Sequence, residues 1–356
     1  MRVAIDATPL IGIRTGIGVF VEGLLHSIRE MEDRENRVEM AEYTLSLRAR
    51  MRGQTRGTWV PIPAAQAPVL WRLLNAPKIE RFLGKVDVVH GTNFVVPPST
   101  CPRVLTIHDL SFLGDYPGAG RFNRRLHLSV RKAVESGATI HTISNFVGEE
   151  IRDKYGATDV RVVYPGISQS STRSTSTIPM IVAVGTTQQR KGITELVKAF
   201  EILANHHKEA ELQIVGPPGD SESQVVDCIN RLPLEIQSRV HRVGYVDRQE
   251  RDRLIADAMI LAHPSYYEGF GLPVIEAMSM GTPVVTTTGG AIPEVVGDAA
   301  LTVAPGQVEA LAAALLELLN DERSRNTLIS AGLNRSRKFN WSNSAQGMID
   351  LYTSLA

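Results

Sequence analysis

A Ser/Thr-rich stretch near the middle of the chain, Ser168–Thr177, contains no aromatic or aliphatic side chain, which is typical of an interdomain linker. On both sides of it, short apolar runs of strand length alternate with helical patterns. This alternation favours parallel sheets covered by helices. The sequence therefore predicts two doubly wound, Rossmann-like α/β domains, residues 1–167 and 179–340. A linker over 168–178 joins them, and their strand ends are expected to face each other across a cleft.

The strand predicted over Tyr43–Arg52 has a distinctive pattern in the first domain. Its apolar residues alternate with arginines, so we expect a half-buried strand with a basic outer face. Gly16 and Gly18 follow the first strand without the third glycine of a dinucleotide-binding motif, so nicotinamide binding is not favoured. The other strands expected here are Val3–Ile5, Val86–His90, Val104–Ile107, Thr139–Ile143 and Val160–Tyr164.

Polar residues directly follow two of these strands. His90 ends one, and His108 with Asp109 follows the next. Because open α/β sheets bind ligands at the carboxyl ends of their strands, His108 is a candidate catalytic residue. A single histidine is more often a structural hydrogen-bonding residue, and that alternative stays open.

In the second domain, the loop Gly185–Gly192 lies between a predicted strand, Met180–Val184, and a predicted helix, Ile193–Leu203. Arg190 and Lys191 in this loop can reach phosphate oxygens that also face the helix N-terminus. A charged pair in an exposed loop is, alternatively, only solvated. The other strands expected here are Glu211–Val215, Val240–Val246, Met259–Ala262, Pro283–Thr286 and Ala300–Val303.

The stretch from Glu268 to Glu276 carries the strongest chemical signal. Gly269 and Gly271 allow a tight turn after a strand, and Pro273 suits the first position of a helix. The helix N-terminus favours a phosphate, while carboxylates accept hydrogen bonds from neighbouring hydroxyl groups. With Glu276 expected in the first helical turn, the pattern predicts a site for a sugar attached to phosphate. The alternative is an ordinary strand, turn and helix with two solvated glutamates.

Basic and acidic residues balance over the whole chain, 38 against 38, which argues against a nucleic-acid partner. Locally, however, the charges do not balance. Residues 1–177 hold 23 basic and 17 acidic residues, and residues 40–134 hold 14 basic and 5 acidic residues. The first domain is therefore expected to face an anionic partner. A basic amphipathic helix predicted over Arg121–Val134 either packs its apolar face on the core or lies against an anionic membrane surface.

The two cysteines, Cys101 and Cys228, do not have the spacing of metal ligands. The sequence has no apolar run of 18 residues and no signal-peptide pattern. We therefore expect a soluble protein in the reducing cytoplasm, with peripheral contact to the inner face of the membrane as an option.

With these features in place, the chain resembles a family-4 glycosyltransferase of the GT-B fold over nearly its whole length. The most specific mark is the pair Glu268 and Glu276, separated by seven residues. In that family, the first carboxylate binds hydroxyls of the donor sugar and the second binds the ribose of the nucleotide. The resemblance also implies that Lys191 binds the diphosphate with help from Arg190, and that His108 is the active-site histidine.

Looser matches complete the implied site. Asp109 matches a position where the family contacts the acceptor, and Ser144 one where it contacts the phosphate or the acceptor. The remaining donor-binding positions are Gly16 and Gly18 of a mobile N-terminal loop, Tyr245 and Val246 beside the base, and the turn residues Gly269, Phe270, Gly271 and Leu272.

One position departs from the family pattern: Thr186 stands where many relatives have an arginine. The sequence around His90–Asn93 and Gly185–Thr186 is most similar to bacterial branches of the family that transfer mannose or related hexoses to surface polysaccharide or lipid-linked acceptors. The family also returns its last helix to the first domain, and residues 341–356 are the candidate for it.

The resemblance implies transfer of a hexose, with mannose favoured and GDP-mannose as the matching donor, to a hydroxyl of a polysaccharide, oligosaccharide or lipid-linked acceptor. The configuration at the anomeric carbon is retained, with His108, Glu268 and Lys191 as the catalytic group. The nucleotide sugar is a co-substrate, so no cofactor is expected, and the absence of Asp-x-Asp agrees with metal independence.

Three other functions are compatible with parts of this pattern. A glycoside hydrolase also uses two carboxylates, but Glu268 and Glu276 match a binding pair in a strand–turn–helix better. A GT-B sugar-nucleotide isomerase or epimerase and a non-catalytic nucleotide-sugar-binding subunit remain as alternatives.

Overall fold

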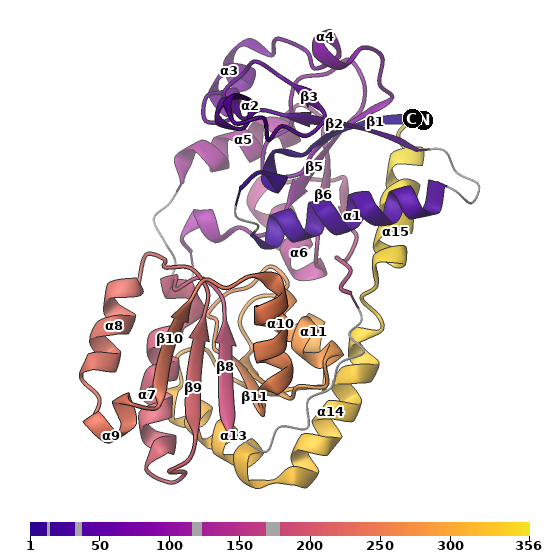
Figure 1. The fold of residues 1–356 in the computed structure, drawn as a ribbon. Helices are drawn as coiled ribbons and strands as arrows, with labels where there is room; N and C mark the ends of the chain where they lie inside the picture. The colour runs from indigo at the N-terminus through magenta and orange to yellow at the C-terminus, as the bar shows by residue number, and fades with distance from the viewer. Residues whose placement is uncertain (13–14, 33–37, 116–122, 169–178) are drawn as a thin grey trace. The chain divides into compact units, whose positions relative to one another are not determined.

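The computed structural model describes residues 1–12, 15–32, 38–115, 123–168 and 179–356. These residues form two compact units (Figure 1). The first unit contains Met1–Leu113, the described part of Arg121–Gly166, and Phe339–Ala356. The second contains the described parts of Gly114–Gly120 and Ile167–Lys338. Apart from Ser168, the expected linker lies outside the described residues.

The first unit is built on a seven-stranded sheet of order β3-β2-β1-β4-β5-β6-β7, in which every neighbouring pair is parallel. Its elements are β1 (Arg2–Asp6), α1 (Gly16–Glu32), β2 (Glu39–Thr44), α2 (Leu47–Met51), β3 (Thr58–Trp59), α3 (Ala67–Leu74), α4 (Glu80–Leu83), β4 (Val88–Gly91), β5 (Arg103–Ile107), α5 (Arg124–Glu135), β6 (Thr139–Thr142), α6 (Asn145–Tyr155), β7 (Val160–Val162) and α15 (Trp341–Thr353).

The second unit has a six-stranded parallel sheet of order β10-β9-β8-β11-β12-β13. Its elements are β8 (Met180–Val184), the 3-10 turn η3 (Gln189–Lys191), α7 (Ile193–Ala204), β9 (Glu211–Val215), α8 (Glu222–Asn230), α9 (Leu234–Gln237), β10 (Val240–Gly244), α10 (Arg248–Asp257), β11 (Ile260–His263), α11 (Leu272–Ser279), β12 (Val284–Thr287), α12 (Ile292–Val296), β13 (Leu301–Val303), α13 (Val308–Asn320) and α14 (Glu322–Ser336).

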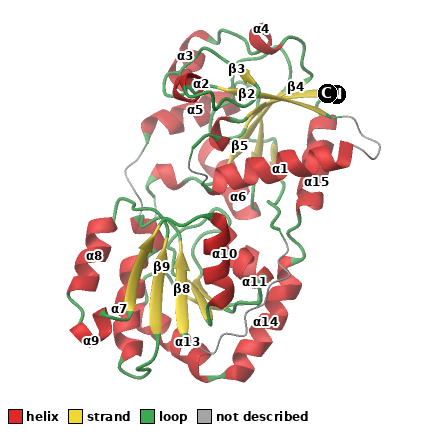
Figure 2. Cartoon of the chain, viewed as in Figure 1, coloured by secondary structure: helices red, strands yellow, loops and turns green. Residues whose placement is uncertain are grey.

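The central strands of both sheets are buried along their whole length, as β4, β11 and β12 show. Burial on both sides is expected of a parallel sheet, because its crossover helices cover both faces. In the second unit, α7, α8 and α13 pack on one face of the sheet, and α10 and α11 pack on the other (Figure 2). The predicted architecture of two doubly wound parallel-sheet domains is confirmed.

The strand predicted over Tyr43–Arg52 is wrong. The strand ends at Thr44, and the arginine-rich part forms the short helix α2 instead. Ser46 starts that helix, because its Oγ accepts a hydrogen bond from the backbone N–H of Ala49 at 3.1 Å. The apolar positions of this run fit alternation by chance, and a local helix cap overrides the pattern.

The basic amphipathic helix is observed as α5, which begins at Arg124. Asn123 caps it, since the Asn123 side chain accepts hydrogen bonds from the next backbone N–H groups at 3.2 and 3.3 Å. Val130 and Ala133 on its apolar face are buried in the core of the first unit. Of the two alternatives for this face, packing on the core is the one observed.

Helix α15 packs on α1 within the first unit (Figure 1). Gly23 of α1 allows the close approach, because a Cβ there would lie 2.1 Å from Cζ2 of Trp341. At the other end of α15, the hydroxyl of Tyr352 lies 2.7 Å from Nδ1 of His90 in β4. The last helix of the chain is thus bound to the first sheet by both close packing and a buried hydrogen bond.

His90 begins a chain of buried hydrogen bonds that crosses three strands. Nε2 of His90 lies 2.6 Å from Oγ1 of Thr106, and this oxygen lies 2.8 Å from Nδ1 of His141. Nε2 of His141 lies 3.3 Å from the carbonyl oxygen of Val163, which can only accept. The proton on His141 Nε2 therefore fixes all the other donors, so that Tyr352 donates to His90, His90 to Thr106, and Thr106 to His141. Burial holds the pKa of both imidazoles below the usual value, so both rings are neutral at pH 7.

Tyr352→Phe should destabilise the first unit, because Nδ1 of His90 loses the hydroxyl that donates to it at a site that water does not reach. An unsatisfied buried acceptor costs about 1–3 kcal/mol, which corresponds to a drop of roughly 2–10 °C in the unfolding midpoint. Differential scanning calorimetry measures this drop. Tyr155→Phe is the control, since its partly exposed hydroxyl lies 3.2 Å from His127, and its midpoint should change little. Equal midpoints for wild type and Tyr352→Phe would contradict the assigned chain of donors.

Candidate functional site

The strand order of the second unit reverses between β8 and β11, which are neighbours in the sheet but not in the sequence. At such a switch point the two following loops leave in opposite directions and open a crevice at the carboxyl edge. The loop with Lys191 follows β8, and the turn with Glu268 follows β11. The topology therefore explains why these two residues meet.

The loop after β8 is fixed against the end of β11 by backbone contacts. The N–H of Tyr266 donates to the carbonyl oxygen of Arg190 at 2.7 Å. Gly192 has φ 64°, and a Cβ on it would lie 2.2 Å from the carbonyl oxygen of Pro264. Only glycine fits there, and the close approach places the Lys191 side chain beside Glu268.

Glu268 is the centre of a buried polar cluster. Its Oε1 accepts hydrogen bonds from Nζ of Lys191 at 2.5 Å, from Oγ of Ser265 at 2.7 Å and from Nε2 of His263 at 2.9 Å. Its Oε2 lies 3.4 Å from Nη1 of Arg190. The side chains of Glu268, Lys191 and Arg190 are only 7%, 14% and 18% exposed, so little water screens these charges.

This environment keeps Glu268 ionised. Burial acts to raise the pKa of its carboxyl, but the Lys191 charge, the His263 hydrogen bond and the Arg190 charge together hold that pKa well below the usual value. Burial also lowers the pKa of His263, so its ring is neutral and its Nε2–H donates to the carboxylate. A permanently charged, hydrogen-bonded carboxylate suits binding of hydroxyl groups rather than proton transfer.

Glu276 is held apart from this cluster by a different partner. Its Oε1 accepts from Nη2 of Arg251 in α10 at 3.1 Å, and Arg251 also contacts Asp252 at 2.6 Å. Burial raises the pKa of Glu276 although Arg251 counteracts the shift. The second carboxylate is therefore buried and oriented from α10, and is not solvated as the alternative interpretation required.

Helix α11 begins immediately after the glycine-rich turn. Gly271 caps it in the left-handed conformation, φ 93°, and no side chain of the described residues caps its first N–H groups. Because the helix starts at Leu272, Glu276 lies beyond its first turn, and that detail of the prediction is wrong. Gly269 and Phe270 are buried in the turn, so the helix N-terminus follows directly after Glu268.

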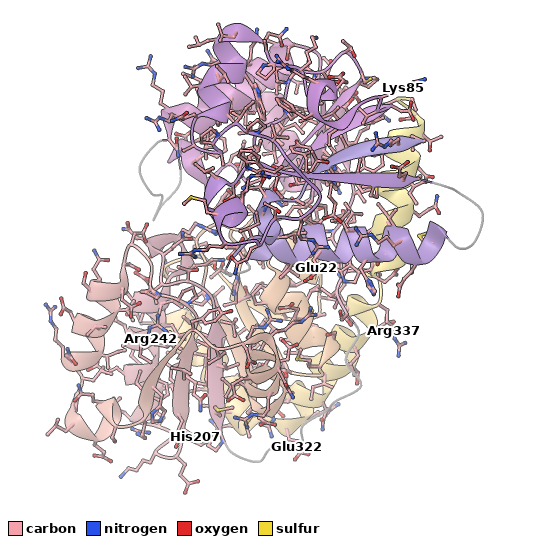
Figure 3. The ribbon with its side chains drawn as sticks, turned by 45° about the horizontal axis from the view of Figure 1, so that its top comes forward. Glu22, Lys85, His207, Arg242, Glu322 and Arg337 are labelled. Atoms are coloured by element: carbon pink, nitrogen blue, oxygen red, sulfur yellow. The ribbon has the colours of Figure 1, made fainter. Side chains whose placement is uncertain are left out.

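Tyr245 and Val246 directly follow β10, at the same edge of the sheet. Tyr245 is 56% exposed. Arg242 of β10 (Figure 3) forms hydrogen bonds to Glu222 at 3.0 and 3.1 Å, and Glu222 in turn accepts from the hydroxyl of Thr187. Since Thr187 lies in the Lys191 loop, this arrangement supports the loop from the side of β10.

In the first unit, the equivalent switch point lies between β1 and β4. His108 follows β5 next to it and is buried, with Nε2–H donating to the carbonyl oxygen of Thr92 at 2.9 Å. Burial lowers the pKa of His108, so the ring is neutral and Nδ1 is left as an acceptor. Phe20 and Phe94 pack edge-on against the ring, with centroids 5.4 and 6.3 Å away.

The structure gives Asp109 and Ser144 local backbone roles. Oδ1 of Asp109 accepts from the N–H of Ser111 at 2.9 Å, and Oγ of Ser144 caps α6 by accepting from Val147 at 3.2 Å. Both lie at the carboxyl edge of the first sheet, after β5 and β6. Their predicted role toward an acceptor remains a prediction.

Gly16 and Gly18 lie in the first turn of α1 rather than in a loop. Gly18 is buried and Gly16 is exposed. The loop interpretation came from the glycines and from the resemblance to the family, whereas the helix forms because its following residues present a buried apolar face that includes Phe20 and Leu24.

A group of polar residues that the sequence patterns did not predict lies at the same edge of the first sheet. Asp6 ends β1 and is 6% exposed, and burial raises the pKa of its carboxyl to about 6. Among the described residues, Tyr43 Oη, Thr44 Oγ1 and Asn93 Oδ1 are buried without a hydrogen-bond partner. A buried polar atom without a partner calls for an explanation in its surroundings, such as an ordered water molecule, an ion or a catalytic role. The position of these residues at or just beyond the end of a strand is the one feature of the sequence from which they could have been predicted.

Within the described ranges, no group of three or more His, Cys, Asp or Glu side chains has the geometry of a metal site. No helix among them is both long and apolar enough to cross a bilayer.

Comparison with solved structures identifies the fold class of this architecture. Sucrose-phosphate synthase from Thermosynechococcus elongatus superimposes with a TM-score of 0.78 at 20% identity, over 99% of this chain and 98% of that one. Anabaena HepE in complex with UDP and glucose gives 0.75 at 18% identity, over 100% of both. These likenesses show the fold, and the predicted GT-B class is confirmed.

Sequence comparison gives the family. Residues 168–335 match the model described as Glycosyl transferases group 1, and residues 16–170 match Glycosyltransferase Family 4. O-antigen chain mannosyltransferase B of Escherichia coli is 31% identical over 283 residues, 74% of either chain. The MMP alpha-(1->4)-mannosyltransferase of Mycolicibacterium hassiacum is 35% identical over 169 residues, 46% of this chain and 39% of that one. The chain belongs to the family-4 glycosyltransferases, and it is an enzyme of the transferase class.

Asp6→Asn should stabilise the protein at neutral pH. Because the folded state raises the pKa of Asp6 from 3.8 to about 6, the wild type loses stability as pH rises through that range. The loss is on the order of 3 kcal/mol, and the neutral amide of the variant avoids it. Urea denaturation should therefore show the variant more stable above pH 6 and equal to wild type near pH 4.

Asp159→Asn provides the opposite control. Although partial burial works against it, the Thr139 and Arg161 hydrogen bonds lower the pKa of Asp159, so this variant should be less stable at pH 7. If the Asp6→Asn variant instead follows the wild-type pH curve, the raised pKa assigned to the buried Asp6 carboxyl is wrong.

Proposed function

We propose that this protein is a retaining, metal-independent hexosyltransferase that moves a hexose, with mannose favoured, from a nucleoside diphosphate sugar to a hydroxyl group of a glycan or lipid-linked acceptor. The observation that carries the proposal is the buried contact between Lys191 and Glu268 at the switch point of the second sheet. The contact puts a cation for phosphate and a carboxylate for hydroxyl groups within one hydrogen bond of each other.

Different residues of the second unit bind different parts of the donor. Lys191, with Arg190 beside it, binds the diphosphate, and the uncapped N-terminus of α11 offers N–H groups to the same anion. Glu268 then turns from Lys191 to the hydroxyls of the sugar. Glu276, oriented by Arg251, accepts hydrogen bonds from the ribose, while Tyr245 and Val246 lie beside the base.

The leaving diphosphate must be stabilised as the sugar bond breaks, and preorganised positive groups do this without a metal. Lys191 is held in place before the donor arrives, because Glu268 and the clamped loop fix it. Retention then follows if the acceptor hydroxyl attacks on the face that the diphosphate leaves, with a phosphate oxygen as base. EDTA should leave this activity unchanged.

The edge of the first unit supplies the acceptor side. Nδ1 of neutral His108 accepts a hydrogen bond from a substrate hydroxyl, because Nε2 is committed to Thr92. The orphan groups of Tyr43, Thr44 and Asn93 are suited to the many hydroxyls of a glycan. A basic first domain with peripheral contact to an anionic membrane would bring a lipid-linked acceptor to this edge.

Relatives support the choice of substrate class. Two similar curated proteins are named as mannosyltransferases, one acting in O-antigen chains, and a solved neighbour is in complex with UDP and glucose. A sugar-nucleotide isomerase or epimerase would turn over the donor without an acceptor. A non-catalytic binding subunit would bind the donor without transfer to any extract.

Lys191→Ala and Glu276→Ala should each weaken binding of the donor, the first through the diphosphate and the second through the ribose. Loss of a charged hydrogen bond costs roughly 1.5–3 kcal/mol, or about 10- to 150-fold in Kd. Isothermal titration calorimetry with a panel of nucleoside diphosphate sugars measures the change in Kd and identifies the donor. Arg239→Gln is the control, because the Arg239 side chain donates to backbone carbonyl oxygens away from this edge. Unchanged affinity in both variants would overturn the donor site.

His108→Ala should lower turnover more than donor affinity, because His108 lies in the first unit and faces the acceptor in this proposal. Single-turnover transfer of a radiolabelled sugar separates the two quantities, and an effect on the order of 100-fold is expected for loss of a positioned polar group. His127→Ala, on α5 of the same unit, should transfer at the wild-type rate. A normal single-turnover rate in His108→Ala would contradict its catalytic role.

A further inference from the structure

A pocket lies in the first unit, away from the edge described above. It is formed by α3, the segment after β4, the start of β5 and one face of α5, and encloses about 410 Å³ of atom-free space, part of it open to solvent. Arg103 is the first residue of β5, whereas His108 follows the last residue of that strand. The pocket therefore reaches the amino end of β5, opposite the proposed acceptor edge.

The charges that line this pocket have one sign. Arg72, Arg103 and Lys132 are among its lining residues, and no carboxylate is. Throughout the described ranges, no ion pair is formed by Arg72 or by Lys132. Burial lowers the pKa of the Arg103 guanidinium, which shows that the pocket already disfavours uncompensated positive charge.

Helix ends explain only part of this charge. Arg72 and Lys132 lie in the last turns of α3 and α5, where cations interact favourably with the helix dipole. Nη2 of Arg103 donates to the carbonyl oxygen of Ser136 at 2.5 Å and thus satisfies one end of α5. Two cations remain for which the described part of the chain provides no carboxylate.

Trp71 supplies an independent sign of a ligand. Its side chain lines the pocket and is 5% exposed, and its Nε1 is buried without any hydrogen-bond partner among the described residues. An indole N–H can only donate, so burial without an acceptor costs about 1–3 kcal/mol. Helix capping by cations does not account for this donor, and an oxyanion bound in the pocket would offer it an acceptor.

The surroundings indicate what carries the oxyanion. Val95, Val96 and Ala133 give the pocket an apolar side. Leu73 and Leu74, which directly follow Arg72, are 69% and 65% exposed. An anionic group attached to an apolar or neutral part fits both features.

We propose that this pocket binds the phosphate group of a phosphate ester, with Trp71 Nε1 donating a hydrogen bond to a phosphate oxygen and Arg72, Arg103 and Lys132 balancing its charge. This site goes beyond the proposed transferase function, since neither Lys191 nor Glu268 takes part. It also gives a use to the excess of basic residues between 40 and 134, much of which the donor and acceptor sites leave unexplained.

The test follows the indole N–H resonance of Trp71 by NMR in the full-length protein. The chain has three tryptophans, and Trp71→Phe identifies the signal by its loss. Titration with glycerol 3-phosphate should move this resonance saturably. Because the probe is in the pocket, phosphate binding at the donor site does not produce the signal, and Lys191→Ala should leave the shift unchanged.

Matched variants on one helix locate the charge. Lys132→Gln should weaken the phosphate affinity about tenfold or more, whereas Arg124→Gln, on α5 but outside the pocket lining, should change it less than about twofold. Arg72→Gln should resemble Lys132→Gln. Both positions are at the surface of their helices, and circular dichroism verifies their folding. Equal weakening by Lys132→Gln and Arg124→Gln would overturn the site and leave only general attraction of anions.

A sedimentation assay with phosphatidylglycerol vesicles identifies the source of the phosphate. Sedimentation of the wild type that Lys132→Gln abolishes supports a lipid headgroup in this pocket. A shift with glycerol 3-phosphate and no sedimentation supports a free phosphate ester. If the Trp71 resonance does not move with either ligand, the proposal is wrong.

Discussion

The proposed donor site depends on one buried ion pair, Lys191 with Glu268. A carboxylate that is 7% exposed would be costly in isolation, and the pair stays ionised because Lys191, Arg190 and His263 compensate it together. Removing Lys191 takes away the closest cation of the Glu268 carboxylate, and removing Glu268 takes away a carboxylate that contacts both Lys191 and Arg190. The contact therefore sets both the charge state of Glu268 and the position of the side chains around it.

The topology of the sheet is what brings the two partners together. Lys191 and Glu268 are separated by 77 residues, yet β8 and β11 are hydrogen-bonded neighbours, so their loops leave the same edge. Gly192 then allows the Lys191 loop to pack on the backbone after β11. The first unit repeats this logic with β1 and β4, where Asp6 and Thr92 lie at the switch point and Thr92 orients His108.

Much of this arrangement can be predicted from sequence, because buried parallel strands are continuous apolar runs. Met180–Val184 and Glu211–Val215 have the predicted bounds, and the meeting of Lys191 and Glu268 follows from their positions after strands. The strand predicted over Tyr43–Arg52 does not form over its whole length, because a helix cap at Ser46 is a local contact that an alternating pattern does not reveal. The strand-end position of Asp6 could be read from the sequence, but its raised pKa and the buried N–H of Trp71 could not, since the burial of a polar atom is a property of packing in three dimensions.

In the proposed function, Lys191 binds the diphosphate while Glu268 binds the sugar. Calorimetry with a nucleoside diphosphate and with the same nucleotide carrying its sugar, on Lys191→Met and Glu268→Gln, separates the two roles. We expect Lys191→Met to weaken the binding of both ligands alike. Glu268→Gln should weaken only the sugar-bearing ligand, and should leave the bare diphosphate unchanged or bound more tightly, because Lys191 is released. Equal weakening of both ligands by Glu268→Gln would contradict these two roles.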